Sequence, residues 1–309
     1  MRIAITGVSG FVGRALTSFF EARGDVITRV VRSYGGIPAN ERTVIWHPQQ
    51  GTIERPGLEG QDVVIHLAGE SIAGVWTGPK KRRIRQSREL GTRLLARTLS
   101  ELERPPRVLF SASAMGFYGS RAEPVDETSG PGTGFLAEVA QVWERETGTA
   151  QHAGIRVVHM RLGNVLHPDG GALAVLVPVI RLGLGAPFGS GRQPWPWIAR
   201  DEIGPAIVHL LERPEIVGPV NFVAPHTVTN GEFTAALSAV LGRRSYLRVP
   251  AFAARLAPGG MGEEMLLGGA PVVPRRLLDS GYRFRWPELR ATLEAMIGGQ
   301  VGGARGEDR

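Results

Sequence analysis

Three glycines in the stretch "ITGVSGFVGRAL", Gly7, Gly10 and Gly13, stand three residues apart between an apolar run and a helical pattern. Each suits one step in binding a pyrophosphate. Gly7 permits a tight turn, Gly10 lets backbone N–H groups approach the phosphates, and Gly13 lets the helix pack closely on the strand. The spacing predicts a dinucleotide-binding loop, and the alternative is a structural turn that binds nothing.

The end of the next apolar run indicates which dinucleotide would bind. A site for NAD places Asp or Glu there to accept hydrogen bonds from the ribose 2′-hydroxyl, but "VITRVVRS" ends in Arg32 and Ser33. A guanidinium suits a 2′-phosphate and offers NAD no acceptor, so we expect NADP(H). The alternative is a solvated arginine at a strand end. The other loop residues expected to line the cofactor are Ser9, Phe11 and Val12.

The elements that must position these residues follow from the alternation of short apolar runs with longer amphipathic stretches. The runs are "IAIT", "VITRVV", "VVIHLA", "RVLFSA" and "IRVVHM". That rhythm predicts an α/β fold of the Rossmann type, a doubly wound parallel sheet with helices on both faces. We expect this domain to span 1–163 plus about 198–218. A smaller C-terminal substrate subdomain would take 164–197 and 219–297, and 298–309 would be a disordered tail.

Composition excludes several kinds of chemistry. The chain of 309 residues has no cysteine, so it can form neither a disulfide nor a thiolate nucleophile, and its seven histidines show no ligand-like spacing. We therefore expect no metal. No segment has the ~18 apolar residues of a membrane span, and no signal region precedes the first strand, which indicates a cytoplasmic protein without membrane contact. The basic stretch "KKRRIRQSRELGTR" lacks interleaved aromatic residues, so nucleic-acid binding is disfavoured.

Taken together, these motifs show that the chain resembles the extended, atypical short-chain dehydrogenase/reductase superfamily, and within it an NAD(P)-dependent epimerase-like family with a C-terminal domain of unknown function. The resemblance covers the chain to about residue 297. It is carried by "TGVSGFVG", "SASAMGFYG", "GFLAEVAQVWE", "RLGNVL" and "PVVPRRLLDSGYRFRWPEL". It implies a Rossmann domain, a nicotinamide cofactor and a small substrate domain, without implying a settled reaction.

The resemblance also implies roles for single residues. Ser113 resembles the catalytic serine, which hydrogen-bonds a substrate oxygen where negative charge develops. The alternative is a strand-end hydroxyl satisfied by the backbone. The segment "HLAGE" would pass beside the cofactor through Leu67, Ala68, Gly69 and Glu70. The substrate pocket would include Ser71, Asn164, Val165 and Trp197.

The departures from the family pattern concern the proton donor. Active relatives carry a Tyr-x-x-x-Lys pair, but this chain has Phe135 and Val139 at the best-matching positions. Arg88 stands where many relatives have asparagine, and Ala199 where they often have histidine. Tyr118 in "GFYG" is a candidate substitute donor, although relatives with an intact pair often carry a tyrosine there too. Glu70 and Glu138 are further candidate acids, and Glu138 is more typical of a solvated helix residue.

Two hypotheses of different classes remain open. The leading one is an NADP(H)-dependent oxidoreductase or epimerase-like enzyme with a non-standard proton donor. Its substrate would be a small, phosphorylated or nucleotide-linked molecule. The rival is a non-catalytic sensor that binds NADP(H) and acts through a partner. Many relatives dimerise through two long helices, here roughly 79–103 and 134–150, so the resemblance also implies a homodimer.

Overall fold

The apolar runs of the first half of the chain form one eight-stranded sheet with the strand order β11-β7-β6-β5-β1-β2-β3-β4. The structure is a computed structural model that describes residues 1–33, 42–244, 247–256 and 258–301. The strands of the sheet are β1 (Arg2–Thr6), β2 (Val26–Val31), β3 (Thr43–His47), β4 (Thr52–Ile53), β5 (Val63–His66), β6 (Val108–Ala114), β7 (Arg156–Leu162) and β11 (Gly218–Phe222).

The pairing of these strands confirms the predicted mostly parallel sheet. Strand β1 is parallel to both β2 and β5, β2 is parallel to β3, and β5 is parallel to β6. The short strand β4 is antiparallel to β3. Because the central strand β1 is flanked by β2 on one side and β5 on the other, the segments that follow these three strands lie at one edge of the sheet.

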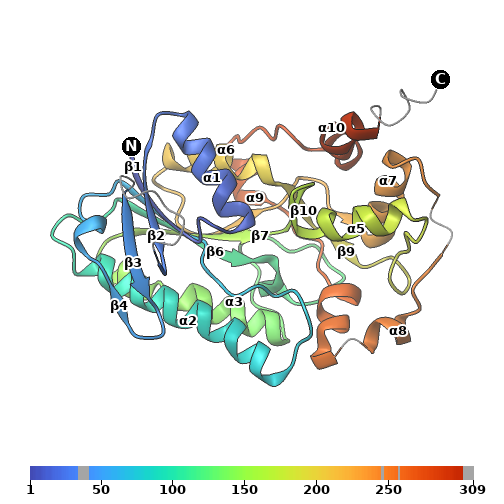
Figure 1. Cartoon of the computed structure of the whole chain (residues 1–309), viewed down its shortest axis with the longest axis horizontal. Coiled ribbons are helices and arrows are strands. Elements are labelled where there is room, and N and C mark those ends of the chain that lie inside the picture. Colours follow the sequence, from blue (N-terminus) through green and yellow to red (C-terminus); the bar gives the residue numbers. More distant parts are fainter. Residues whose placement is uncertain (34–41, 245–246, 257, 302–309) are drawn as a thin grey trace. The chain divides into compact units, whose positions relative to one another are not determined.

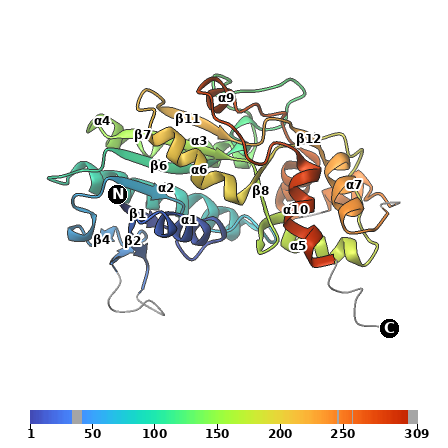
Figure 2. The same cartoon turned by 90° about the horizontal axis from the view of Figure 1, so that it is seen from above.

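Helices cover both faces of this sheet, as Figures 1 and 2 show. Helices α1 and α6 lie over one face, and α2, α3 and α4 lie over the other. Their bounds are α1 (Phe11–Ala22), α2 (Gly78–Ser100), α3 (Phe135–Arg145), α4 (Gly148–His152) and α6 (Arg200–Leu211). The helix predicted over roughly 134–150 is therefore two helices, because the chain makes a turn at Glu146 and Thr147, and threonine has a low helix propensity.

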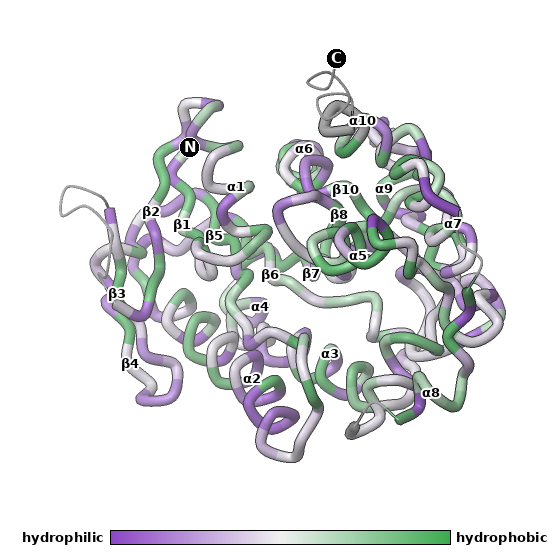
Figure 3. Tube along the Cα trace, turned by 45° about the vertical axis from the view of Figure 1, so that its right-hand side comes forward, coloured by the Kyte–Doolittle hydropathy of each residue, from purple (hydrophilic) through white to green (hydrophobic). Residues whose placement is uncertain are grey.

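The core of this sheet is built from strand residues that are covered on both faces, as parallel strands require. Ile3, Ala4 and Ile5 of β1 and Val64 and Ile65 of β5 are fully buried. Figure 3 shows the same strands as a hydrophobic band. Side chains of α2 complete one side of this core. Sequence periodicity alone therefore accounts for the central strands, while the short strands β3 and β4 had no counterpart among the predicted elements.

The chain divides into two units, each interrupted in sequence. Unit 1 comprises 1–117, 135–161 and 204–220, and unit 2 comprises 118–134, 162–203 and 221–309. The expected first domain differs from unit 1 mainly in the segment 118–134, which belongs to unit 2. Backbone hydrogen bonds from Val125 to Pro271 and from Val273 to Val125 tie this segment to residues far along the chain. Local sequence patterns carry no signal for such a pairing.

Unit 2 is a smaller α/β assembly with two short two-stranded sheets, β8 with β10 in parallel and β9 with β12 antiparallel. Its core gathers side chains of α5, α7 and α10, among them Leu173, Phe233 and Leu293. The bounds are β8 (Asn164–His167), α5 (Gly171–Arg181), β9 (Pro194–Trp195), β10 (Trp197–Ala199), β12 (Val228–Thr229), α7 (Asn230–Val240), α8 (Ala251–Arg255), α9 (Arg275–Asp279) and α10 (Leu289–Val301).

The carboxyl-terminal helix runs further than the sequence indicates. The backbone of α10 continues to Val301, into the segment predicted to be a disordered tail. Residues 302–309, the rest of that predicted tail, lie outside the described residues. Among the helices of the described residues, none combines the length and the apolar character that crossing a bilayer demands.

Candidate functional site

The glycine loop after β1 has a geometry that side chains would disrupt. Gly7 has a φ of +71°, which L-residues rarely adopt, and its carbonyl accepts a hydrogen bond of 2.9 Å from the N–H of Gly10. A Cβ atom on Gly13 would lie only 2.1 Å from the Gly7 oxygen, while one on Gly10 would lie 3.1 Å from it. Gly13 is therefore required by packing, whereas Gly10 leaves its outer side open.

The amino-terminal end of α1 lacks the side-chain cap that many helices have. No side chain caps Gly10, and the first turn of α1 carries no acidic residue. In contrast, the Thr77 side chain caps α2 by accepting from the Lys80 N–H. The amino-terminal amides of a helix carry partial positive charge. Because the loop at Ser9 and Gly10 is exposed, an anion can reach the amino terminus of α1 there. Phe11 and Val12 are half-buried behind that loop.

A buried hydrogen-bond network beneath the loop was not found by sequence reasoning. The Thr6 hydroxyl accepts from the N–H groups of Leu67 and Ala68 at 3.0 and 3.1 Å. Its proton must then go to Nδ1 of His66, 2.8 Å away, which leaves His66 Nε2 to donate to Thr92. Burial, helped by the positive charge of Arg88, lowers the pKa of His66 to about 3. A neutral histidine thus fixes the segment after β5 to the end of β1.

Arg32 follows the last residue of β2, where the sequence places it. Both Arg32 and Ser33 are exposed. Strand β2 lies beside β1, so the exposed guanidinium stands at the same sheet edge as the glycine loop. This arrangement has the charge that a 2′-phosphate needs and lacks a carboxylate at the end of β2.

The segment after β5 is held by side chains of α2. A Cβ atom on Gly69 would lie 3.3 Å from Cζ of Arg88, so the small residue here makes room for a guanidinium of the protein itself. The Glu70 carboxylate accepts a hydrogen bond from Lys80 at 2.8 Å and lies 3.7 Å from Arg83. The hydrogen bond to Lys80 is the main cause that lowers the pKa of Glu70. Glu70 is therefore ionised near neutral pH, which argues against its use as an acid.

Ser113 belongs to a buried polar cluster that joins β6, α3 and β7. Its hydroxyl donates to Oε1 of Glu144 at 2.7 Å, and Ser113 is only 2% exposed. Arg161 donates two hydrogen bonds of 2.8 Å to the same carboxylate. Its guanidinium lies over the Phe117 ring, with Cζ 3.5 Å from the ring centroid. The Ser113 proton is thus engaged in this conformation, so the hydroxyl offers a ligand its lone pairs only.

The partners of Ser113 could have been suspected from one signal. An arginine inside the mostly apolar stretch "VVHMRL" must find a partner when buried, because charged side chains are almost never buried alone. The sequence did not indicate that the partner would be Glu144, which lies one turn past the helix positions compared with the family pattern. Residues 113, 144 and 161 meet only because α3 packs on β6 and β7. Spacing along the sequence does not show this packing.

The beginning of α3 places the Phe135 ring against another aromatic side chain. Its ring packs edge-on against Trp76, with centroids 5.2 Å apart, and Val139 is 4% exposed. The ammonium of Lys81 lies 4.9 Å from the Phe135 ring centroid. Neither Phe135 nor Val139 can carry a proton, so the departure from the Tyr-x-x-x-Lys pattern is also a departure in the chemistry of this helix.

Tyr118 lies in unit 2 and is fully buried. Its hydroxyl donates to Oδ1 of Asn221 at 2.7 Å. Tyr282, also in unit 2, donates to Glu202, and burial together with that carboxylate raises the pKa of its phenol. Within the described residues of unit 1 there is no tyrosine. The role assigned to Tyr118 stays a prediction, and it would require this hydroxyl to leave its buried partner.

The residues expected in the substrate pocket fall in different settings. Asn164 is half-buried and both its N–H and its side-chain amide donate to the Pro196 carbonyl at 2.9 Å. Val165 is half-buried beside it, whereas Ser71 in unit 1 is exposed. Trp197 is 1% exposed and packs among apolar side chains in the core of unit 2, and its place in a substrate pocket stays a prediction. Burial of this kind is not visible in the "PWPWI" pattern.

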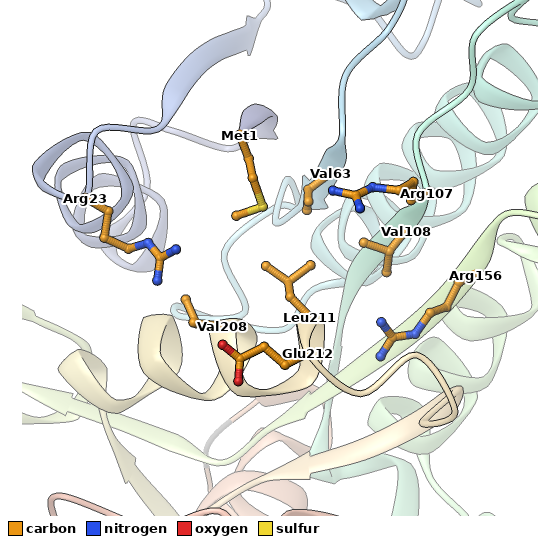
Figure 4. Close-up of a pocket in the computed structure, with 9 residues that line it drawn as sticks. All are labelled: Met1, Arg23, Val63, Arg107, Val108, Arg156, Val208, Leu211 and Glu212. Carbon is orange, nitrogen blue, oxygen red and sulfur yellow. The ribbon is translucent and has the colours of Figure 1, made fainter.

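A separate pocket of about 330 Å³ lies at the opposite edge of the sheet, where strands begin. Figure 4 shows three of its arginines, and each already has protein partners. Arg23 pairs with Asp25, Arg107 lies 3.6 Å from Asp62, and Arg156 donates to two backbone carbonyls. This pocket is therefore not part of the glycine-loop site. It is lined by Met1, Arg23, Val63, Arg107, Val108, Arg156, Val208, Leu211 and Glu212.

The basic residues of α2 are largely neutralised by neighbouring carboxylates. Arg93 bonds both Glu89 and Glu146, and Arg97 bonds Glu101. A surface that pairs its charges in this way presents less net charge to a polyanion than the sequence suggests. Over the ranges that the structure describes, no group of three or more histidines and carboxylates is arranged to hold a metal ion.

Comparisons with known proteins agree with this geometry. Residues 3–223 match the NAD dependent epimerase/dehydratase family, and residues 249–296 match a domain of unknown function, DUF1731. The epimerase family protein Mb2239 of Mycobacterium bovis is 38% identical over 91% of this chain and 93% of its own length. The human epimerase family protein SDR39U1 is 33% identical over 96% of this chain and 100% of its own length.

Two solved structures are similar over nearly the whole chain. Human SDR39U1 (isoform 2), crystallised with NADPH, has a TM-score of 0.87 and 32% identity, covering 96% of this chain and 99% of that one. A nucleoside-diphosphate sugar epimerase from Corynebacterium glutamicum has a TM-score of 0.77 and 32% identity, covering 96% of this chain and 58% of that one. The resemblance drawn from the sequence motifs is confirmed: the chain belongs to the NAD dependent epimerase/dehydratase family and carries the DUF1731 domain after it.

Proposed function

We propose that this chain binds NADPH through unit 1. The observation that carries the proposal is the combination of an uncapped α1 behind a glycine loop with an exposed Arg32 at the neighbouring strand end. The loop suits a pyrophosphate and the guanidinium suits a 2′-phosphate. The relative crystallised with NADPH supports this proposal, since it shares the fold across almost the whole chain.

We further propose that the protein is an oxidoreductase or epimerase-like enzyme for a small, phosphorylated or nucleotide-linked substrate. The nicotinamide would supply or accept a hydride. Ser113 would orient a substrate oxygen, and Asn164 with Val165 would border the substrate. Because Ser113 donates its proton to Glu144, we expect it to accept a hydrogen bond from a substrate hydroxyl. The proton donor would lie outside the start of α3.

The cluster of Ser113, Glu144 and Arg161 also favours a second candidate function, that of a non-catalytic sensor. A protein that binds NADPH, changes a surface and signals through a partner needs no proton donor. The Ser113 hydroxyl donates to Glu144, and the start of α3 carries an aromatic residue without a proton to give. Both features are compatible with a sensor, because a sensor transfers no proton. A screen of carbonyl and sugar-nucleotide substrates by NADPH absorbance separates the two functions. Turnover that depends on Ser113 supports the enzyme, and tight binding without turnover supports the sensor.

The binding proposal is tested by titrating the wild-type chain with NADPH and NADH in a calorimeter. Hydrogen bonds to charged groups contribute about 1.5–3 kcal/mol, which corresponds to roughly tenfold to a hundredfold in affinity. We therefore expect NADPH to bind at least about tenfold more tightly than NADH, and Arg32→Asp to reverse that preference. Arg82→Asp on α2 makes the same charge change at an exposed site and serves as the control. Equal affinity for both dinucleotides in the wild type would refute the role of Arg32.

A cytoplasmic location and a homodimer through α2 and α3 also stay proposals. Size-exclusion chromatography with light scattering tests the second directly. A single species with the mass of one chain at micromolar concentration would refute the homodimer.

A further inference from the structure

Arg88 is a positive charge that the protein holds below the surface without a carboxylate. Its Nη1 donates to the carbonyls of Glu70 and Ile84 at 3.0 and 3.1 Å. In the part of the chain that the structure describes, no acidic side chain lies within ion-pair distance of Arg88. Burial lowers the pKa of this guanidinium to about 10, yet it remains charged at neutral pH. The Glu70 carboxylate acts on Arg88 only from beyond ion-pair distance, where it partly opposes this lowering. A half-buried cation with no carboxylate in ion-pair contact costs free energy that a bound anion would offset.

The position of Arg88 is fixed by packing on two sides. Its Cζ lies 4.6 Å from the ring centroid of Trp143 on α3, and a Cβ atom on Gly69 would lie 3.3 Å from the same Cζ. Two nitrogens, Nε and Nη2, make no hydrogen bond to the described protein, and neither is sealed from solvent. The guanidinium is therefore held in place with two donors available to a ligand. Such pre-organisation reduces the entropy lost on binding.

The topology indicates which part of a dinucleotide would meet these donors. Strands β2 and β5 flank β1 on opposite sides. With the 2′-phosphate at Arg32 after β2 and the pyrophosphate at the loop after β1, the remaining half extends over the segment after β5. Gly69 belongs to that segment. It begins with Leu67 and Ala68, which the Thr6 hydroxyl binds directly beneath the glycine loop.

We propose that Arg88 binds the nicotinamide half of the dinucleotide, through its ribose or phosphate oxygens. This inference rests on the proposed binding of NADPH. It supplies a cation on α2 for a ligand half that Val139 on α3 cannot hold. Arg88 is a binding and positioning residue here, and no proton transfer is assigned to it.

The test compares NADPH with adenosine 2′,5′-bisphosphate, which contains the adenine and the 2′-phosphate but lacks the nicotinamide half. Arg88→Met retains the length and the packing on Trp143 and removes the charge. We expect it to weaken NADPH roughly tenfold to a hundredfold and to leave the bisphosphate within about twofold of wild type. Arg32→Ser should weaken both ligands. Arg88→Lys should retain part of the NADPH affinity, and Arg82→Met, exposed on the same helix, should change neither.

Each outcome bears on one of the two proposals. Wild-type protein that fails to bind NADPH overturns the proposed function and this inference with it. Wild-type binding that Arg88→Met leaves unchanged overturns this inference alone. Equal losses for NADPH and the bisphosphate in Arg88→Met would mean that Arg88 only supports the loop, and would overturn it as well. If Arg88→Met does not fold, the same two ligands are titrated against Arg88→Lys, where loss of both overturns the inference.

Discussion

The two halves of unit 1 that would meet a nicotinamide dinucleotide and its substrate differ in how they use their polar groups. Around the glycine loop, α1 is uncapped and Arg32 is exposed. Around Ser113, the hydroxyl and Arg161 both donate to the Glu144 carboxylate, and Phe135 packs on Trp76. The first region exposes an uncapped helix end and a guanidinium, and the second region hydrogen-bonds its polar side chains within the protein. Binding and chemistry can therefore be lost separately on this fold.

The largest expected effect concerns turnover. General acid catalysis contributes about 10²- to 10⁴-fold, so without a tyrosine on α3 we expect carbonyl and sugar-nucleotide substrates to turn over slowly or not at all. Loss of NADPH absorbance measures this, with Ser113→Ala and Tyr118→Phe as variants. Brisk wild-type reduction that collapses in Tyr118→Phe would overturn the contrast between the two regions, because the buried phenol of unit 2 would then be the donor.

A second prediction concerns the cluster of Ser113, Glu144 and Arg161. Glu144→Ala leaves Arg161 buried without its counter-charge, so the free energy of unfolding should fall by about 3–5 kcal/mol. Urea denaturation followed by circular dichroism measures it. Glu138→Ala removes an exposed carboxylate from the same helix and should change stability by less than about 0.5 kcal/mol. Similar small losses in both variants would show that the cluster does not stabilise the fold.

A third prediction tests the glycine loop. A valine at Gly10 would fill the space through which the backbone reaches a pyrophosphate, whereas inside the protein its Cβ meets only the Gly7 oxygen at 3.1 Å. We expect Gly10→Val to reduce NADPH affinity by about a hundredfold or more, or about 2.7 kcal/mol, with little change in the melting temperature. Gly148→Val, where a Cβ meets nothing within 4 Å, is the matched control. Unchanged affinity in Gly10→Val would make the loop purely structural.

A fourth prediction concerns a pH dependence of stability that arises from two buried histidines. Burial is the main cause that lowers the pKa of His159 and, to about 3, that of His66. The unfolded chain would protonate both near pH ~6.5, so below that pH the unfolded state binds more protons than the native state. Stability should therefore fall as the pH drops from ~6.5 towards 5, by up to about 1.4 kcal/mol per pH unit for each histidine.

Denaturation curves at pH 7.5 and 5.0 measure this slope. His66→Gln should flatten it by removing one of the two buried histidines, even though the variant loses stability overall. A wild-type slope near zero over this range would contradict the neutral state assigned to His66 by its hydrogen bonds to Thr6 and Thr92.

The sequence predicted the features that depend on local spacing. The glycine loop, the strand ends at Arg32 and Ser113, and the aromatic start of α3 all follow from short patterns read along the chain. The sequence did not predict that Ser113 would donate to Glu144, nor that Val125 would pair with Pro271 and Val273. These contacts join residues far apart in sequence, and their partners are set by how elements pack rather than by any periodicity.

The role of Gly69 illustrates the same limit. Gly69 was expected to lie beside the cofactor, which stays a prediction, and the structure places a guanidinium of the protein against it. A glycine in a motif indicates that something comes close, and it does not indicate what.

A crystal structure of this chain with NADPH bound would test the contrast between the glycine loop and the Ser113 cluster most directly. We predict the pyrophosphate over the amino terminus of α1, the 2′-phosphate on Arg32 and Ser113 still bonded to Glu144. We also predict that no tyrosine hydroxyl lies within hydrogen-bonding distance of the space in front of the nicotinamide C4, where a substrate oxygen would sit. A tyrosine and a lysine placed together beside the nicotinamide, from any part of the chain, would contradict this account.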